Sequence, residues 1–594
     1  MQLVFRFRFV SVFFSVVPNF LGASSSSLGE CRTRKDITIY GAYRGLCALR
    51  MFPVAQAQTR LVIDTSNIVA TVDVDKFLCA TLDWWPPSKC DYGPCPWGQA
   101  SILDLDLEIP LLEKTLAGLA PFMVRVGGTL QDLVVYNVGD LLSTEPCVPF
   151  AFDPSSRYSY TGGCLHMERW DALNRLFMKT GTSVVFGLSA LYGRSKSSAR
   201  EQIVSPWNSR NAENFMRYTR DRAYPVVAWE LGNELMGKGH TGKSISPEVY
   251  ALDVKKLRRI IDKLYRQGVP KPSLVAPDTL YKLQDTDNIV RFLNASGKGV
   301  VDAVTRHIYT LGAGVAETSV VINNVLNDSN AKAEILKYKT IQSVLKEHPK
   351  TSAWVGEAGG IFNNGHPEVS NAFISAFWYL DQLGTASRYN NQAFCRQTFV
   401  GGFYGILDLN FNPNPDYYGA LLWQQLMGSG VFAVDIRGGN TDVRAYAHCQ
   451  RNSQSGVTLL VLNYSNSTRQ RLDLSLVGYS ADHNTSPSNF QALITSRKCE
   501  EDECLTSNEA SSEDVRLEYH MSPANNSLTS RTVLLNGQPL LVTPSGDIPT
   551  LSPVKVNMNS PISLAPLTYA YVVIPGANPP ACAASKTSGG RMSS

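Results

Sequence analysis

The chain lacks the closely spaced cysteine and histidine ligands of a typical zinc site. It contains no CxxC pair and no histidine cluster, so the sequence does not indicate a structural metal. Its 12 Cys are better explained as disulfide partners, as in proteins that fold in an oxidising compartment. Local candidates are Cys90–Cys95, Cys147–Cys164 and Cys499–Cys504, and the sequence alone leaves the connectivity open.

A long apolar run is also missing beyond the N-terminal region. A membrane-spanning helix needs about 20 predominantly apolar residues, and no later segment reaches that length. Residues 1–23 combine Arg6 and Arg8 with a short apolar stretch and small residues near Ala23, the pattern of an export signal. We expect cleavage after Ala23, an unpatterned segment over 24–58, and secretion to the cell wall or apoplast. Vacuolar or lysosomal delivery and peripheral membrane association are the alternatives, and VAQAQ (54–58) is a second candidate processing site.

Six N-x-[ST] sequons agree with secretion. One sequon is weak evidence, but six behind an export signal favour a glycoprotein. They begin at Asn294, Asn327, Asn463, Asn466, Asn484 and Asn525.

A strong net charge is absent too. With 55 Lys and Arg against 51 Asp and Glu, the net charge is only +4, which indicates no nucleic-acid partner and neither demands nor excludes an acidic substrate. Two local basic clusters stand out. KKLRR (255–259) lies in a helical pattern, where a solvated surface is the ordinary explanation. RSKSSAR (194–200) follows a predicted strand and is the better candidate for contact with an acidic substrate.

No GxGxxG turn follows an early strand, which argues against a doubly wound dinucleotide-binding sheet. Instead, short apolar runs alternate with longer amphipathic stretches. This alternation predicts a (β/α)8 barrel over residues 75–428. The eight predicted strands are 77–85, 122–129, 183–191, 226–234, 273–280, 303–309, 352–359 and 399–408.

The pattern changes after the barrel. Short alternating strands separated by Gly, Pro and Asn turns predict a β-sandwich over 429–576. The strand-like segment 59–74, although it precedes the barrel, is expected to join that sandwich. The low-complexity tail 577–594 is predicted to be disordered, apart from any pairing of Cys582.

WELGNEL (229–235) places two acids at the end of an apolar strand, where an unpaired buried carboxylate is costly. The active site of a barrel forms at the carboxyl ends of its strands. Glu234 closes the fourth predicted strand and Glu230 lies deeper on the same strand face, because side chains alternate with period two. We therefore interpret Glu230 as a structural acid and Glu234 as the acid that meets the substrate.

A second acid, Glu357 in SAWVGEAGG, closes the seventh predicted strand, across the barrel mouth. Such a pair has the geometry of a glycosidase, retaining at a carboxyl separation of about 5–5.5 Å and inverting at about 6.5–9.5 Å. Glu357 would attack the anomeric carbon, and Glu234, with a raised pKa, would protonate the departing oxygen. Asn233 would hydrogen-bond the sugar 2-hydroxyl. The structural alternative pairs both acids with Arg125 or Arg306.

WELGNE and WVGEAGG resemble retaining glycosidases of the large (β/α)8 clan, and more closely the heparanases and related β-glucuronidases of glycoside hydrolase family 79. Further segments look like the heparanase-like branch found in plants, and the likeness runs from about residue 59 to 575. Those segments are ATLDWWPPSKCDYGPCPWG, VRVGGTLQD, CLHMERWDALN, VVFGLSAL, FWYLDQLG, CRQTFVGG, NPNPDYYGALLWQQLMG and RAYAHC.

The resemblance implies acid/base Glu234, nucleophile Glu357, and no metal or organic cofactor. It implies a first sugar subsite that contains Asp83, Thr129, Asn233, Tyr309, Gln397 and Tyr404, with Tyr309 hydrogen-bonded to the nucleophile. The alternatives are that Asp83 caps a strand end and that His307 and Tyr309 form a core pair.

The family is also similar in holding a uronate carboxylate on backbone amides after the nucleophile. Here that segment reads GEAGGIFNNGH, with Phe362 where a Tyr is usual. Backbone around Asn363, Asn364 and Gly365 would form the anion-binding nest.

We therefore expect a secreted, monomeric endo- or exo-β-glucuronidase that cleaves glucuronate-bearing polysaccharides, proteoglycan side chains or small glucuronides. One alternative is a glycosidase of the same clan with neutral-sugar specificity. The other is a non-catalytic glycan-binding relative.

Overall fold

The computed structural model describes residues 59–91, 93–139, 147–156, 159–194, 205–236, 244–439, 441–478 and 515–583. The predicted export signal (1–23), the segment 24–58, the sequon at Asn484 and the candidate pair Cys499–Cys504 lie outside these residues.

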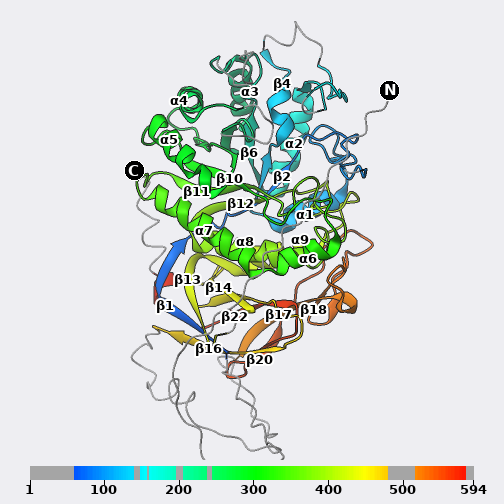
Figure 1. The fold of residues 1–594 in the computed structure, drawn as a ribbon, viewed down its shortest axis with the longest axis vertical. Coiled ribbons are helices and arrows are strands. Elements are labelled where there is room, and N and C mark those ends of the chain that lie inside the picture. Colours follow the sequence, from blue (N-terminus) through cyan, green and yellow to red (C-terminus); the bar gives the residue numbers. More distant parts are fainter. Residues whose placement is uncertain are drawn as a thin grey trace, which may run out of the picture. The chain divides into compact units, whose positions relative to one another are not determined.

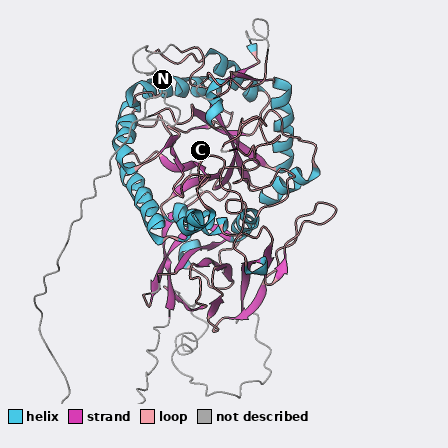
Figure 2. Ribbon diagram, turned by 45° about the vertical axis from the view of Figure 1, so that its right-hand side comes forward, coloured by secondary structure: helices cyan, strands magenta, loops and turns pink. Residues whose placement is uncertain are grey.

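A (β/α)8 barrel forms the first folded region, with helices arranged around a ring of parallel strands (Figure 2). Its strands run in the order β8-β7-β6-β3-β2-β12-β11-β10-β9. The two ends of that order both belong to the fifth predicted strand, and the Ala276 N–H donates to the Ala303 carbonyl at 3.1 Å. The ring therefore closes across a split fifth strand. The strands are β2 (Leu78–Leu82), β3 (Phe122–Val126), β6 (Thr182–Leu188), β7 (Val226–Leu231), β8 (Ser273–Leu274), β9 (Thr279–Leu280), β10 (Ala303–Ile308), β11 (Ser352–Ala358) and β12 (Asn391–Arg396).

The eighth barrel strand differs from the prediction. It is β12, whereas the predicted segment 399–408 forms a loop at the carboxyl end of that strand. The loop has an apolar sequence because the side chains of Phe399, Val400 and Leu407 pack in the protein interior. Apolar content alone could not separate this buried loop from the short strand before it.

A layer of side chains that range in size from alanine to tryptophan, contributed by most of the strands, packs inside the barrel. Within it the disulfide Cys79–Cys395 joins β2 to β12, the first and last strands of the ring. Cys90–Cys95 and Cys147–Cys164 are paired as the sequence suggested. Cys79–Cys395 and Cys449–Cys582 were not identified, because their partners are 316 and 133 residues apart.

Helices surround the ring, and two of them are covered on both sides. Every described position of α9 up to Gln424, and nearly all of α8, is buried. Both helices lie against the barrel, and both also contact strands of the second region. Among the described residues, none of the helices combines the length and the apolar character that a bilayer span requires. The helices are α1 (Pro110–Leu119), α2 (Met167–Thr180), α3 (Arg210–Asp221), α4 (Pro247–Leu264), α5 (Thr286–Ser296), α6 (Thr318–Leu326), α7 (Asp328–Leu345), α8 (Ser375–Arg388) and α9 (Pro415–Leu426).

A largely antiparallel β-sandwich forms the second region. Its strand order is β19-β18-β17-β22-β15-β14-β13-β1-β16-β21, and β20 pairs with β17. The early strand β1 (Thr59–Thr71) lies between β13 and β16, so the blue ribbon of β1 runs beside strands from the far end of the chain (Figure 1). The other strands are β13 (Met427–Arg437), β14 (Val443–Gln450), β15 (Val457–Asn463), β16 (Gln470–Val477), β17 (Val515–Pro523), β18 (Val533–Leu535), β19 (Gln538–Pro539), β20 (Val554–Asn557), β21 (Ile562–Leu564) and β22 (Thr568–Ile574).

The tail prediction needs a correction over 577–583. These residues are described, Ala577 is buried in the sandwich core, and Cys582 forms a disulfide with Cys449 of β14. The covalent link holds the segment against the sandwich despite its low-complexity composition. Residues 584–594 lie outside the described part.

Candidate active site

Glu234 is positioned by a turn and not by strand alternation. Strand β7 ends at Leu231, and Gly232 (φ +73°) and Glu234 (φ +53°) then adopt left-handed conformations. The Glu234 N–H donates to the carbonyl of Asp278 at 2.8 Å, which holds the turn. A left-handed glutamate is uncommon and mildly strained, as is typical of residues placed for function. The expectation that Glu230 and Glu234 share one strand face is therefore replaced by this turn.

Glu357 lies on β11 and meets Glu234 at the barrel mouth. A carboxylate oxygen of each acid lies within 4.8 Å of one on the other. That spacing is close to the roughly 5–5.5 Å of retaining glycosidases and well short of the roughly 6.5–9.5 Å of inverting enzymes. Both carboxylates are largely buried, Glu234 at 5% exposure and Glu357 at 8%. The pair therefore has the spacing for direct attack by one acid.

Two neighbours hold the Glu357 carboxylate. Nη1 of Arg125, from β3, donates to Oε2 at 2.9 Å, and the Tyr309 hydroxyl donates to Oε1 at 2.5 Å. The tyrosine contact is the one that the family resemblance implied. Because each oxygen has its own donor, the carboxylate is fixed in orientation.

Arg125 also organises the acids behind the mouth. Its Nε donates to Glu230 at 2.8 Å, and its Nη2 donates to Asp278 and, at 3.0 Å, to Asn233. Glu230 is fully buried, and burial raises its pKa to about 7 although Arg125 opposes the shift. This confirms Glu230 as a hydrogen-bonded structural acid. Arg125 belongs to the same internal network.

His307 bridges Glu234 to the buried carboxylate of Asp278. Its Nδ1 lies 2.7 Å from Glu234, and its Nε2 lies 2.7 Å from Asp278. Burial lowers the pKa of His307, but the carboxylates of Asp278 and Glu357 outweigh it and raise the pKa well above its ordinary value. The ring is then an imidazolium with two N–H donors. His307 is thus part of the site, not a core partner of Tyr309.

Asp278 balances this charge. Burial raises its pKa, but Arg125 and His307 outweigh burial and lower the pKa below its ordinary value.

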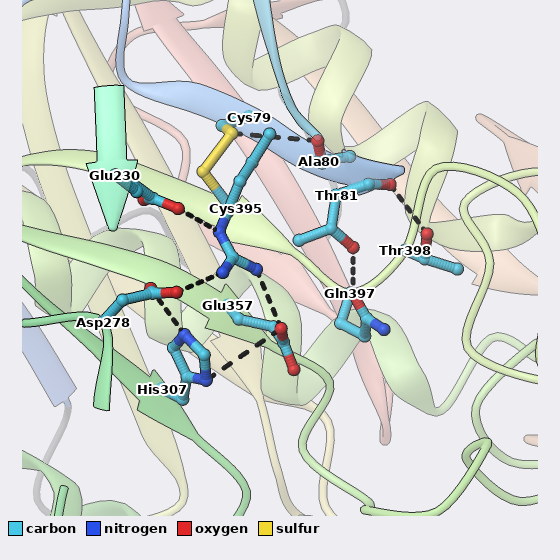
Figure 3. Close-up of a disulfide and its surroundings, with 11 residues drawn as sticks. Cys79, Ala80, Thr81, Glu230, Asp278, His307, Glu357, Cys395, Gln397 and Thr398 are labelled. Carbon is cyan, nitrogen blue, oxygen red and sulfur yellow. Dashed lines mark hydrogen bonds and ion pairs between the residues drawn. A yellow bond between two sulfur atoms is a disulfide. The ribbon is translucent and has the colours of Figure 1, made fainter. Parts of the chain in front are cut away.

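Figure 3 shows Glu230, Asp278, His307 and Glu357 converging close to the Cys79–Cys395 disulfide. The disulfide, between the first and last strands, supports the wall that carries Thr81 and Gln397.

One wall of the site is built around Asp83. The Gln397 amide donates to Asp83 at 3.0 Å, and the Thr81 hydroxyl donates to Gln397. Burial, and then the nearby Glu357 charge, raise the pKa of Asp83 to about 7. A side chain at Gly128 would collide with Asp83, so the turn that leads into Thr129 approaches the acid closely. The Asp83 carboxylate also accepts a hydrogen bond from the Trp84 N–H at 2.7 Å, so it caps the strand end as well as forming part of this wall.

Tyr404 joins this wall to the loop after β11. Its hydroxyl lies 3.5 Å from the Gln397 amide, and its ring makes an edge contact with Trp97. Trp97 Nε1 donates to the Asn364 side-chain oxygen at 2.8 Å. Asn363, Asn364 and Gly365 are left-handed in succession (φ +58°, +69° and +75°). The N–H groups of Asn364 and Gly365 have no acceptor among the described residues, which is the arrangement of an anion-binding nest.

One group of ligand-type side chains in the described part is compact enough for a metal ion: Glu234, His307 and Glu357. A metal-bound histidine must be deprotonated, and both nitrogens of His307 are engaged with carboxylates. The arrangement therefore suits proton transfer better than metal binding.

The chain matches a known enzyme family over most of the barrel. Residues 58–384, more than half of the sequence, match the N-terminal domain of glycosyl hydrolase family 79. The chain belongs to this glycoside hydrolase family. It is 42% identical over 518 residues to heparanase-like protein 3 of Arabidopsis thaliana, which covers 87% of this chain and 92% of that protein. It is 35% identical to the baicalin-beta-D-glucuronidase of Scutellaria baicalensis, over 90% of this chain and 96% of that one.

The fold is shared more widely. The structure of a 4-O-alpha-L-rhamnosyl-beta-D-glucuronidase from Fusarium oxysporum superposes with a TM-score of 0.57 at 13% identity, covering 86% of this chain and 99% of that one. At such low identity this likeness establishes the barrel with its added sandwich. Family membership makes the chain a glycoside hydrolase.

Other predicted contacts are not at the site. Arg306 is buried 3.9 Å from the Tyr338 ring and makes no ion pair with either acid. Arg194, the first residue of RSKSSAR, pairs with Asp253 at 2.8 Å, and 195–200 lie outside the described residues. KKLRR lies on the outer helix α4, where Arg258 pairs with Asp302. Neither cluster contributes a described residue to the mouth.

The main residues that sequence reasoning missed are Asp278 and the bridging role of His307. Asp278 lies in SLVAPDTL, at the end of the fifth predicted strand. The rule that singled out Glu234 and Glu357, an acid at a strand end, applies to it equally. His307 gave no such signal, because a histidine within a strand is as common in an ordinary protein core as it is in an active site.

The sequons fall into two groups. Asn463 is fully buried, and its amide nitrogen donates to the backbone carbonyls of Thr468, Leu564 and Ala565. The folded chain therefore has no room for a glycan there, and that candidate is withdrawn. The exposed sequons are Asn294, Asn327, Asn466 and Asn525.

Proposed function

We propose that the chain is a retaining β-glucuronidase of the heparanase type, acting on glucuronate-bearing glycans or small glucuronides. The observation that carries the mechanism is the spacing of Glu234 and Glu357, whose carboxylate oxygens lie within 4.8 Å. An inverting enzyme needs room for a water molecule between its carboxylate base and the sugar. Two carboxylates this close leave no such room.

In the first step Glu357 attacks the anomeric carbon. The bond from that carbon to the leaving oxygen breaks, and the proton of Glu234 passes to the oxygen. Arg125 and Tyr309 keep the attacking carboxylate aligned. Asn233 accepts from Arg125 through its oxygen, so its amide nitrogen remains a donor for the 2-hydroxyl.

In the second step Glu234 takes a proton from water. The water oxygen attacks the anomeric carbon, the ester bond to Glu357 breaks, and the carboxylate is restored. The His307 imidazolium donates to Glu234 throughout and is itself anchored by Asp278. This keeps the Glu234 carboxyl aimed at the same point in both steps.

The left-handed loop after β11 supports recognition of the uronate. The backbone amides of Asn364 and Gly365, which have no acceptor among the described residues, form a positive concavity suited to a carboxylate. Phe362 lacks the hydroxyl of the usual tyrosine, so the backbone carries the contact. Asp83 and Gln397 would bind sugar hydroxyls on the opposite wall.

Secretion as a monomeric glycoprotein is part of the proposal. Four disulfides among the described residues suit an oxidising compartment. Glycopeptide mapping of the protein from culture medium, with light scattering for its mass, tests this. Retention inside cells with free thiols would contradict it.

An activated 2-fluoro glucuronide tests the function. Peptide mapping should find a glucuronyl adduct on Glu357 in the wild type and none in Glu357→Gln. An adduct only with the matching 2-fluoro glucoside would keep the mechanism and replace the substrate. No adduct with either reagent, beside a retaining glucuronidase that is labelled, would contradict the enzyme assignment.

A further inference from the structure

A hollow of about 270 Å³ opens at the catalytic end of the barrel. Its walls come from the loops that follow β2, β10, β11 and β12, all at the catalytic end of the barrel. It shares Asn364 and Gly365 with the loop proposed to hold the uronate carboxylate. Neither Glu234 nor Glu357 lines it, so an occupant would lie beside the cleaved residue and not at the bond that breaks.

Two residues in the walls of this hollow carry buried polar atoms without a partner. His366 is 7% exposed and Asn364 is 4% exposed. Neither ring nitrogen of His366 makes a hydrogen bond of ordinary geometry, and neither does the Asn364 amide nitrogen. Buried polar groups without partners are costly and rare in native proteins. A hydrogen-bonding ligand would satisfy them.

The imidazole of His366 is suited to an uncharged partner. Burial lowers the pKa of His366, against the opposing effect of Glu368 and Glu317. The neutral ring has one donor nitrogen and one acceptor nitrogen. A sugar hydroxyl can serve either of them.

The charges around the hollow are acidic. Glu317 is exposed at its edge and has no ion-pair partner among the described residues, and no Lys or Arg lines the walls. Asp91 also lines it, with its charge balanced by Lys89 at 2.9 Å, and Lys89 is held over the Trp85 ring. A sulfate group beside Glu317 would meet that negative charge without a compensating cation among the lining residues.

We infer that this hollow is a subsite for a neutral sugar unit joined to the glucuronate. Hydroxyl groups of such a unit donate to Glu317 and His366 and accept from the side-chain amide of Asn364. The half-buried Phe403 offers an apolar surface to the sugar ring. The enzyme would thus select glycans whose glucuronate has an uncharged neighbour and reject sulfated ones. This inference rests on the proposed glucuronidase function.

The test compares two oligosaccharides that carry glucuronate between galactose units, one neutral and one sulfated on the galactoses. We expect the wild type to favour the neutral compound at least about tenfold in kcat/KM. Glu317→Lys should lower that ratio roughly five- to tenfold, because repulsion at the edge becomes attraction. The ratio is taken within each variant, so a partial loss of folded protein cancels.

Glu347→Lys is the matched control. Glu347 is exposed after α7, before β11 begins, at the opposite end of the barrel. It undergoes the same change of charge and should leave the ratio as in the wild type. An equal ratio in Glu317→Lys and wild type, or a wild-type preference for the sulfated compound, would overturn the subsite.

Binding separates this inference from the proposed function. Saturation-transfer NMR of wild-type protein with neutral digalactoside and its sulfated counterpart needs no turnover. Signals from the neutral compound alone, weakened in Glu317→Lys, would support the subsite even if nitrophenyl glucuronide is not hydrolysed. Hydrolysis of nitrophenyl glucuronide without any selective binding would retain the function and reject the subsite.

Discussion

Nδ1 of His307 lies 2.7 Å from a carboxylate oxygen of Glu234, so a buried imidazolium supports the proposed acid/base residue. The ring is fixed from its other side by Asp278, which is itself held by Arg125. Arg125 in turn reaches Glu357, the proposed nucleophile. The two catalytic acids are therefore coupled through one internal network of charges.

Replacing the nucleophile should abolish turnover without unfolding the protein. Glu357→Gln keeps the shape and both hydrogen-bond neighbours but cannot form the glycosyl ester, so we expect kcat to fall by several orders of magnitude. Hydrolysis of nitrophenyl glucuronide, with circular dichroism for the fold, measures this. Unchanged turnover would remove the assignment of Glu357. Glu347→Gln is the control.

Asp278→Asn should lower the pKa of His307. Loss of the carboxylate removes the largest interaction that favours the imidazolium, so the proton leaves the ring at lower pH. The ring titration followed by NMR should shift downward, and kcat should fall about 10–100-fold as Glu234 loses a charged donor. Asp262→Asn, at an exposed position on α4, controls for net charge. A His307 titration that stays in place would contradict the network.

Asp83 should make stability depend on pH. Its pKa in the folded chain is about 7, against an ordinary 3.8, so folding favours the protonated form. That contribution is complete below about pH 4 and is lost as pH rises to about 7. Denaturant titrations should show the difference in unfolding free energy between Asp83→Asn and wild type growing across that window. A constant difference would mean that Asp83 is ionised throughout.

The Cys79–Cys395 disulfide should stabilise the barrel more than Cys90–Cys95 does. It closes a separation of 316 residues, compared with 5, and the entropy removed from the unfolded chain grows with loop length. We expect the Cys79→Ala/Cys395→Ala variant to lose about 2–5 kcal/mol of unfolding free energy. The Cys90→Ala/Cys95→Ala variant should lose less. Equal losses in urea titrations would argue against this account.

The sequence by itself determined the barrel, the sandwich and the pair of acids that meets at the barrel mouth. Apolar runs alternating with amphipathic stretches are local signals, and seven of the eight predicted strands overlap strands of the ring. Glu234 and Glu357 could be found because an acid at the end of an apolar strand conflicts with ordinary packing. The eighth strand was missed where a buried loop beside it was more apolar than β12 itself.

Only the tertiary structure decided which distant groups meet. Ring closure brings Cys79 to Cys395, and it places Asp278, in the segment between β8 and β9, beside Arg125 of β3. The left-handed turn at Glu234 and the hollow beside His366 depend on how neighbouring loops pack. The periodicity of a sequence indicates which face of a strand or helix is apolar. Which side chains meet across a barrel depends on the closed arrangement of all the strands.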